Sequence, residues 1–488
     1  MALTRASPIL QQPTRGTLVA MFGSGELSDL EPVRQALAQG RYDAAFALLE
    51  SAVRRRRRRR SRALYRLHLA GLYALYGDDG LEDGSLALRS AVETDPGVTE
   101  LFLYQALYWE FGALGGESAR KVKRGLKGVR SGGDAEALYH AANALYTAGA
   151  LEESLVYLAQ LDEAELPGYL GWRRWSLTGL IEEQLGRLES AAAAFELSVQ
   201  LALGADQQLE RLALAGCLLE LHRGEEALAV LDGIDQSQLE LEDDVVHMKY
   251  LAGRAEFERG NPNRALELLE EARALTSGEG DELYPLLLAE GQVMLGLGRV
   301  QEAADLFERS VDNAAEEQLS YALHEWALAL MEVGDLESAE ERLDEVIADL
   351  AYAYRADALA DLAEVLFKLG NFDRAEILAT QALELGATAA ACFTLGSIAY
   401  EYFRLDEAVT WFERAASASE PGEPVWVLAQ QLLADVFAQK GPQMAERLVT
   451  HARAALAYTD PANEWFLPLK GFLETAEREL GGNRRVLN

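Results

Sequence analysis

The sequence feature that most constrains this chain is a pair of small residues that lie twelve positions apart on either side of a short turn. The pair recurs in eight successive segments, and its second member advances by 33 to 38 residues each time. A repeat of this length is typical of solenoids, in which each structural unit packs only on its neighbours. The pairs are Ala142/Ser154, Gly179/Ala191, Ala215/Ala227, Gly253/Ala265, Gly291/Ala303, Ala327/Ala339, Ala363/Ala375 and Gly396/Ala408.

A glycine turn lies between the two members of most pairs, as in Gly-Arg-Leu at 186–188 and Gly-Asn-Phe at 370–372. Glycine at such a turn favours the left-handed conformation that ends a helix. Because antiparallel helices approach closely only where neither is bulky, each segment is predicted to be a tight helix pair. A large apolar residue four positions after the second small one is expected to fill the layer toward the next unit: Leu158, Phe195, Leu231, Leu269, Phe307, Leu343 and Phe412.

The composition agrees with an all-α fold. Half of the residues are hydrophobic, with many Ala and Leu, and only 12 of 488 are Pro. No apolar run reaches the length of a membrane-spanning helix, and the N-terminal residues show no convincing secretory signal. A cytoplasmic protein is therefore expected. Cys217 and Cys392 lie far apart in apolar stretches and are predicted to be small buried core residues.

Two segments carry the closest resemblance to a known family. One holds Leu395-Gly396, Tyr400, Ala408 and Phe412, and the other holds Trp175, Gly179, Ala191 and Phe195. Both resemble the tetratricopeptide repeat, a helix–turn–helix of about 34 residues. Most segments here are longer, and the proline that commonly ends the unit is mostly missing. The resemblance implies an α-solenoid, a right-handed superhelix of helix pairs whose concave groove binds peptides or protein partners.

The chain divides by pattern and by charge. Residues 1–27 are expected to be a flexible lead-in, 28–133 a head of degenerate repeats, 134–460 the regular solenoid, and 461–488 a capping helix and tail. Residues 1–133 contain 20 Lys and Arg against 14 Asp and Glu, whereas the remainder contains 25 against 65. The acidic remainder should repel nucleic acid and anionic membranes.

In the family that the chain resembles, polar positions of the first helix of each unit line the groove. Tyr and Arg are favoured interface residues, so these positions suit a peptide with aromatic or acidic groups. Ordinary packing between helices and solvation remain alternative explanations for each residue. Carried over, the positions are Tyr139, Asn143, Arg173, Ser176, His247, Tyr250, Arg254, Gln292, Tyr321, His324, Phe393, Ser397 and Tyr400.

Two basic segments lie in the head. Seven successive arginines oppose helix formation, since like charges four residues apart destabilise a helix, and an exposed turn is expected there. One interpretation is an electrostatic arm that binds nucleic acid or an acidic protein surface. The alternative is a neutral expansion of an arginine codon. The basic residues are Arg54, Arg55, Arg56, Arg57, Arg58, Arg59 and Arg60, then Arg120, Lys121, Arg124 and Lys127.

Motifs of enzymes, cofactor sites and metal sites are missing from the sequence. The six His are scattered, and no phosphate-binding loop, HExxH motif or nucleophile elbow occurs. The sequence therefore predicts a non-enzymatic scaffold or adaptor, without cofactor or metal, that binds protein or peptide partners. A nucleic-acid-associated or regulatory factor that uses the basic head is the second hypothesis, and a membrane-surface assembly factor is the third. The oligomeric state is left open.

Overall fold

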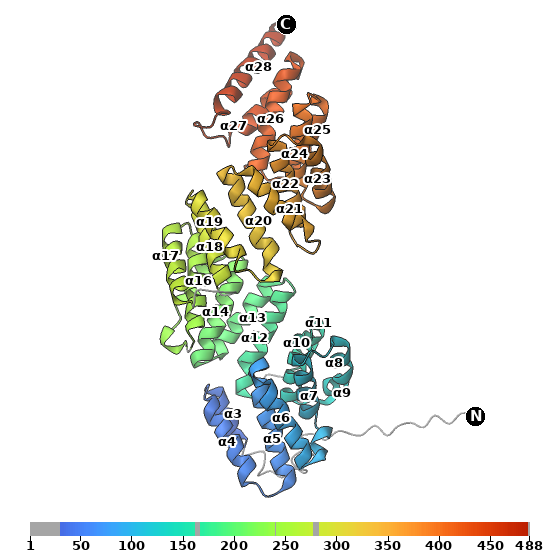
Figure 1. Cartoon of the computed structure of the whole chain (residues 1–488), viewed down its shortest axis with the longest axis vertical. Helices are drawn as coiled ribbons and strands as arrows, with labels where there is room; N and C mark the ends of the chain where they lie inside the picture. Colours follow the sequence, from blue (N-terminus) through green and yellow to red (C-terminus); the bar gives the residue numbers. More distant parts are fainter. Residues whose placement is uncertain (1–29, 162–165, 240, 277–282, 487–488) are drawn as a thin grey trace, which may run out of the picture. The chain divides into compact units, whose positions relative to one another are not determined.

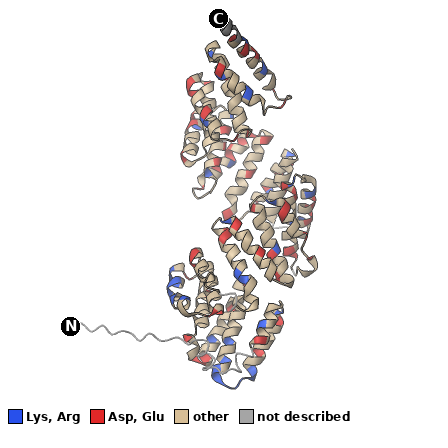
Figure 2. Cartoon of the chain, turned by 180° about the vertical axis from the view of Figure 1, so that it is seen from behind, with Lys and Arg blue, Asp and Glu red and all other residues tan. Residues whose placement is uncertain are grey.

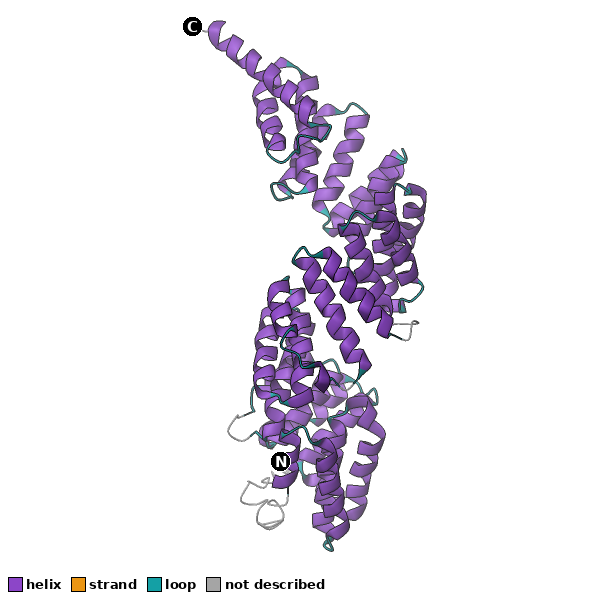
Figure 3. Ribbon diagram, turned by 90° about the vertical axis from the view of Figure 1, so that its left-hand side faces the viewer, coloured by secondary structure: helices purple, strands orange, loops and turns teal. Residues whose placement is uncertain are grey.

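The computed structural model describes residues 30–161, 166–239, 241–276 and 283–486, so the lead-in expected over 1–27 lies outside the described residues. Throughout this described part, the secondary structure is helical, without strands (Figure 3). An all-α solenoid of helical repeats is thereby confirmed. The chain forms two compact units, unit 1 over 1–275 and unit 2 over 276–488. The seam expected near Gly133 lies inside unit 1, at the end of a helix.

Unit 1 contains the helices of the head, α3 to α9, and the helix pairs that follow them (Figure 1). Its α-helices are α3 Glu31–Ala38, α4 Tyr42–Arg55, α5 Arg59–Ala74, α6 Leu81–Thr94, α7 Phe102–Leu114, α8 Ala119–Gly125, α9 Lys127–Gly132, α10 Ala135–Thr147, α11 Leu151–Leu158, α12 Gly168–Gln184, α13 Leu188–Leu201, α14 Gly204–Glu220, α15 Gly224–Leu231, α16 Glu242–Glu258 and α17 Pro262–Leu275.

Unit 2 consists of helix pairs followed by a long final helix that packs on α27 and α26. Its α-helices are α18 Leu283–Gly296, α19 Val300–Val311, α20 Glu316–Val333, α21 Leu336–Ala348, α22 Arg355–Lys368, α23 Phe372–Leu385, α24 Thr388–Glu401, α25 Leu405–Ser417, α26 Pro424–Lys440, α27 Ala445–Leu456 and α28 Phe466–Val486. Within the described residues, no helix combines the length and the apolar character needed to cross a bilayer.

The small residues hold the helices of each pair together as predicted, because the partner helix leaves no room for a larger side chain. A Cβ atom added to Gly291 on α18 would lie 2.6 Å from the ring of Phe307 on α19, and one added to Gly179 would lie 2.6 Å from Phe195. The expectation that these large residues fill the layer toward the next unit was therefore incomplete. They pack over the small residue of their own pair, where Phe307 is fully buried.

The turn glycine ends the first helix in the left-handed conformation, with φ of +71° at both Gly186 and Gly298. This position follows the first small residue of each pair by seven residues. In two pairs it holds His222 and Phe403 instead, and both keep the left-handed backbone with φ of +55°. Such a φ is strained for a residue with a side chain. Phe403 is also 79% exposed, so burial of its ring does not offset the strain.

The head folds back on the solenoid that follows it. Helix α3 packs against α12, although more than a hundred residues separate them, and α4 follows it in a hairpin. Both cysteines are buried and unpaired, as expected. Burial raises the pKa of the Cys217 thiol to about 11, which disfavours the reactive thiolate.

Candidate protein-binding face

The candidate site is the surface that the first helices of successive pairs form side by side, which we call the first-helix face. In unit 1 it comprises α10, α12, α14 and α16, and in unit 2 it comprises α18, α20, α22, α24 and α26. Successive members are in contact, for example α14 with α16 and α22 with α24. The residues predicted to line the groove all lie on these helices, so their individual contacts decide which are available to a partner.

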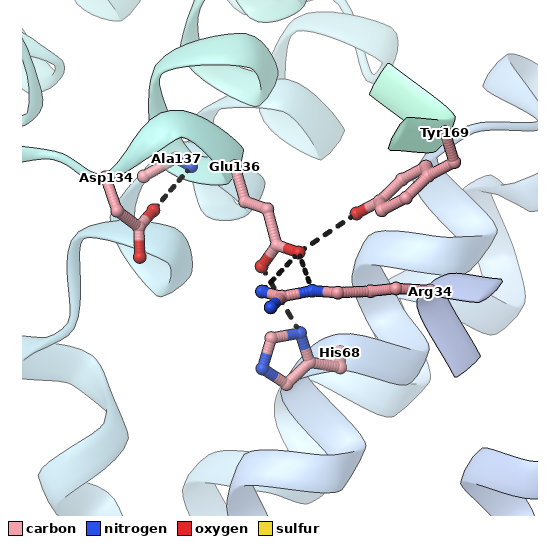
Figure 4. A network of polar contacts seen from close by, with 6 residues as sticks. All are labelled: Arg34, His68, Asp134, Glu136, Ala137 and Tyr169. Atoms are coloured by element: carbon pink, nitrogen blue, oxygen red, sulfur yellow. Dashed lines mark hydrogen bonds and ion pairs between the residues drawn. The ribbon is translucent and has the colours of Figure 1, made fainter. Parts of the chain in front are cut away.

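The head covers the first part of the face in unit 1, at α10 and α12. Arg34 on α3 donates from Nε and Nη2 to Oε1 of Glu136 on α10, at 3.1 and 2.9 Å, and Tyr169 donates to the same oxygen at 3.2 Å (Figure 4). His68 Nδ1 lies 3.7 Å from the other oxygen. The pKa of Glu136 is lowered: its burial opposes this, and the charges of His68 and Arg34 outweigh it. Glu136 thus joins three elements around one buried charge.

A cavity of about 30 Å³ lies beside this network, between α3, α5, α10 and α12. Arg34, His68, Glu136, His140 and Tyr169 contribute its polar lining, and leucines contribute the rest. Such a volume holds a water molecule but no larger ligand. The end of the face under α3 is therefore part of the protein's core and offers no site to a partner.

Tyr139 and Arg173, predicted to line the groove, are occupied by the chain itself. The guanidinium of Arg173 lies over the ring of Trp172 at 4.1 Å and donates to the Tyr42 hydroxyl at 2.7 Å. Tyr42 in turn donates to Asp206. Tyr139 is only 7% exposed beside these residues. Burial, the largest cause, raises the pKa of Tyr42 to about 12, so its hydroxyl stays protonated.

Asn143 belongs to a second buried network. Its amide donates to Glu110 Oε1 at 2.7 Å, and His140 Nδ1 lies 2.7 Å from the other oxygen of the same carboxylate. Glu110 and His140 are buried. The pKa of His140 is raised: burial alone would lower it, but the charge of Glu110 and the hydrogen bond to it prevail. Asn143 therefore stabilises α10 on α7 rather than facing a ligand.

The part of the unit 1 face on α16 is open. His247 is exposed and stacks on Tyr250 with ring centroids 6.2 Å apart, while the Arg254 guanidinium lies 5.8 Å from the Tyr250 ring. Arg254 also donates to Glu220 on α14 at 3.1 Å. Partial desolvation by its neighbours lowers the pKa of His247, so this ring is neutral at pH 7. Nearer the closed end, Ser176 donates to the buried Glu210 at 2.9 Å.

In unit 2 the face carries three tyrosines that we call the tyrosine cluster: Tyr321 on α20, and Tyr352 and Tyr354 in the loop before α22. The Tyr321 and Tyr354 ring centroids lie 6.2 Å apart, and those of Tyr352 and Tyr354 lie 5.8 Å apart. Tyr354 is 55% exposed, while the other two are half-buried. The loop tyrosines were missed in the sequence because they precede the repeat positions, although the alternation in Ala351-Tyr352-Ala353-Tyr354 is visible there.

His324 contacts the tyrosine cluster from its buried side. Its Nδ1 lies 3.0 Å from the Tyr352 hydroxyl and its Nε2 lies 2.9 Å from Asp361 Oδ2 on α22. His324 is buried, so it positions the loop rather than lining the groove as predicted. Gln292 on α18 donates to Glu325 at 3.4 Å. Burial raises the pKa of Tyr321, and the charge of Glu325 raises it further.

The last part of the face is more deeply packed. Phe393 lies against Phe412 with ring centroids 5.6 Å apart, inside the core of unit 2, and Ser397 donates to the Phe393 carbonyl at 3.0 Å. Tyr400 donates to Asp435 and accepts from Gln439 at 2.7 Å. Burial raises the pKa of Tyr400 to about 12. Of these predicted residues, Tyr400 alone has its polar atom at the surface between α24 and α26.

The two basic segments lie at different places in unit 1 (Figure 2). The arginine run forms a turn at 56–58, as expected, but Arg54 and Arg55 continue α4 and Arg59 and Arg60 begin α5. The expectation that the whole run opposes helix was therefore wrong at its ends, where Arg54 pairs with Glu50 one helical turn away. The second segment, with Arg120, Lys121 and Arg124 on α8 and Lys127 on α9, includes the ion pair of Lys121 with Glu117.

Comparison with known proteins agrees with this architecture. A family model described as tetratricopeptide repeat matches residues 250–317, 324–390 and 361–424. No curated protein sequence matches the chain.

Solved structures with the same kind of fold include the Cut9–Hcn1 hetero-tetramer of APC/C (13% identity, 94% of this chain and 98% of that chain, TM-score 0.44). They also include Pseudomonas aeruginosa PilF (14% identity, 47% and 98%, TM-score 0.39) and a thermophilic TPR protein of Thermus thermophilus (17% identity, 40% and 99%, TM-score 0.33). At these identities and TM-scores, no property of these proteins is carried over to this chain. The family model therefore identifies tetratricopeptide repeats over residues 250–317 and 324–424, and the helix pairs closed by small residues at a twelve-residue spacing agree with it.

Proposed function

We propose that this protein is a non-enzymatic scaffold of the cytoplasm that binds partner proteins or peptides on its first-helix face. Tetratricopeptide repeats support protein interaction in general, and the face supplies residue types that suit it. Tyr and Arg are over-represented at binding hot spots because they bury much surface at a low cost in side-chain entropy.

One observation carries the proposal. The face begins under the protein's own head, where Tyr139 and Arg173 are occupied, whereas the side chains on α16 and around the tyrosine cluster reach the surface. Arg254, Tyr250 and Tyr354 thus have both the exposure and the chemistry for contact with another chain. The surface available to a partner is the part of the face that follows the closed end.

The test is a capture experiment with the full chain from its own cells, followed by identification of the bound proteins. The triple variant Tyr250→Ala/Arg254→Ala/Tyr321→Ala should lose partners that the native chain retains. A matched control is Ile377→Ala/Leu385→Ala, which shortens two exposed side chains on the second helix α23 and should keep them. An unchanged set of partners in the triple variant, with native helicity by circular dichroism, would show that this face is not the binding surface.

The nucleic-acid hypothesis stays a separate prediction for the basic segments. Their separation in unit 1, and the pairing of Arg54 and Lys121 with glutamates, give no single continuous basic surface on the described residues. Replacement of Arg54–Arg60 by Ser should abolish any salt-sensitive binding to DNA or RNA. Binding that persists in this variant, or that is missing at low salt in the native chain, removes the hypothesis.

A further inference from the structure

The tyrosine cluster differs from the aromatic residues on the first-helix face of unit 1 in what lies over its rings. In unit 1 the chain supplies its own cations: Arg173 lies 4.1 Å from the Trp172 ring, Arg174 lies 4.8 Å from Trp175, and Arg254 lies near Tyr250. In the tyrosine cluster, no Lys or Arg of the described residues is placed over a ring. The rings of the tyrosine cluster therefore lack the partner that those of unit 1 have.

The charges around the tyrosine cluster are negative. Glu325 lies on α20, and Asp357 and Asp361 lie on α22, whereas α18, α20 and α24 contain no Lys or Arg at all. The cations of the neighbouring elements are engaged elsewhere. Arg355 donates to the Ile347 carbonyl at 2.9 Å, and Arg342 lies over Trp326 and pairs with Glu345 at 2.8 Å. Among the described residues, carboxylates thus lie on both helices beside the cluster, and no Lys or Arg lies over its rings.

The cluster is also held in place before any partner arrives. The loop that carries Tyr352 and Tyr354 is fixed by Asp349, which accepts from Ser320 at 2.8 Å and from the Ala351 amide at 2.9 Å. His324 fixes the Tyr352 hydroxyl from the buried side. A preorganised surface loses less conformational entropy on binding, so its contacts contribute more to affinity.

We propose that the tyrosine cluster, with Glu325 and Asp357, binds a Lys- or Arg-rich segment of a partner protein. Ring faces carry partial negative charge and attract ammonium and guanidinium groups, and carboxylates at the rim add ion pairs and direct the approach. The inference rests on the proposed function, because it assigns a partner chemistry to the same face. It also differs from the acidic or aromatic peptide that the sequence indicates, since no Lys or Arg of the described residues lies over the rings of the cluster to attract such a peptide.

The test measures binding of a short fluorescent peptide that alternates lysine and serine to the full chain, by anisotropy. Tyr354→Ala and Glu325→Gln/Asp357→Asn should each weaken binding about tenfold. Two controls match these changes. Tyr402→Ala removes an exposed ring at the α24–α25 turn, and Glu376→Gln/Glu384→Gln removes as many charges from exposed positions of α23. Both controls should stay within about twofold of the native affinity.

Several outcomes would overturn the inference. These are the absence of binding, equal binding of a peptide with glutamine in place of lysine, and an equal loss in the α23 control, which would reveal a general attraction to an acidic protein. Self-association that disappears when Arg54–Arg60 become Ser would make a second copy the occupant instead. If captured partners depend on the triple variant but no basic peptide binds the cluster, the scaffold proposal stands and this inference alone fails.

Discussion

Where the first-helix face of unit 1 begins, charged groups have their partners within the chain. Arg34 and His68 meet Glu136, Asn143 and His140 meet Glu110, and an arginine lies over each of several aromatic rings. On the corresponding face of unit 2, the tyrosine cluster lies among carboxylates, and no Lys or Arg of the described residues lies over its rings. The same repeat geometry therefore supports two chemistries: one that stabilises the fold at the start of the chain and one that stays available for binding.

The largest expected effect tests the paired charges of unit 1. Glu136→Gln leaves Arg34 without its counter-charge in a buried site. Breaking a fully buried ion pair typically costs about 3–5 kcal/mol, and because a third of the Arg34 side chain is exposed we expect about 2–3 kcal/mol. Urea unfolding of the full chain should show this loss in the transition of unit 1. Glu325→Gln is the matched change in unit 2, and a comparable loss there would contradict the distinction.

Overpacking should affect both units alike, because the small residues serve the same purpose in each. Gly179→Leu in unit 1 and Gly291→Leu in unit 2 place a side chain where a phenylalanine ring already lies. Each should lower the free energy of unfolding by about 1–3 kcal/mol. Gly171→Leu on α12 is a control, since nothing lies near its Cβ position. Melting curves that are unchanged in the first two variants would refute the packing explanation of the twelve-residue spacing.

Removing the strain at the turns of His222 and Phe403 should have a smaller effect on the free energy of unfolding, with the opposite sign. Phe403→Gly in unit 2 and His222→Gly in unit 1 relieve the left-handed backbone and should each stabilise the chain by about 1 kcal/mol. Thermal denaturation measures the shift, with Gly298→Ala as the reverse change at an equivalent turn. If Phe403→Gly destabilises the protein, the exposed ring makes contacts in unit 2 that outweigh the strain.

The smallest effect is a pH dependence of unit 1. The raised pKa of His140 means that its interaction with Glu110 contributes stability fully below the unfolded value of about 6.5 and loses it as the pH rises through the folded pKa. His68 has a lowered pKa, so its contribution has the opposite sign and acts below about 6.5. His140→Gln should therefore flatten the stability of unit 1 above pH 6.5. A profile that is unaltered in this window would show that His140 is neutral when folded.

The sequence predicted those parts of the fold that repeat. The small pairs, the turn glycines and the helix pairs depend on contacts between neighbours, such as Gly291 with Phe307, and a period in the chain reports such contacts directly. The closure by α3 depends instead on Arg34 meeting Glu136, which lies 102 residues further along, and no period marks that contact. Tyr139 and Arg173 were consequently assigned to an open groove.

The binding residues were predictable only in part, for a related reason. Tyr321 and Arg254 lie at repeat positions and were identified, whereas Tyr352 and Tyr354 lie in a loop whose course is set by His324 and Asp349. The spacing of the repeats in the sequence also predicts where the turn glycine is replaced. His222 and Phe403 stand where most pairs have the turn glycine, and they mark the two strained turns without any structure.

The contact between Gly291 and Phe307 has a consequence for how such a protein can change over time. The atoms that pack one helix against its partner lie inside the pair. Gln292, the next residue on α18, instead donates a hydrogen bond to Glu325 on the first-helix face. Packing within the pair and binding of a partner thus depend on different residues of the same helix. Mutations on the first-helix face can change which partner a repeat binds while the contact between its two helices is retained. Binding specificity can therefore evolve without a matching loss of stability.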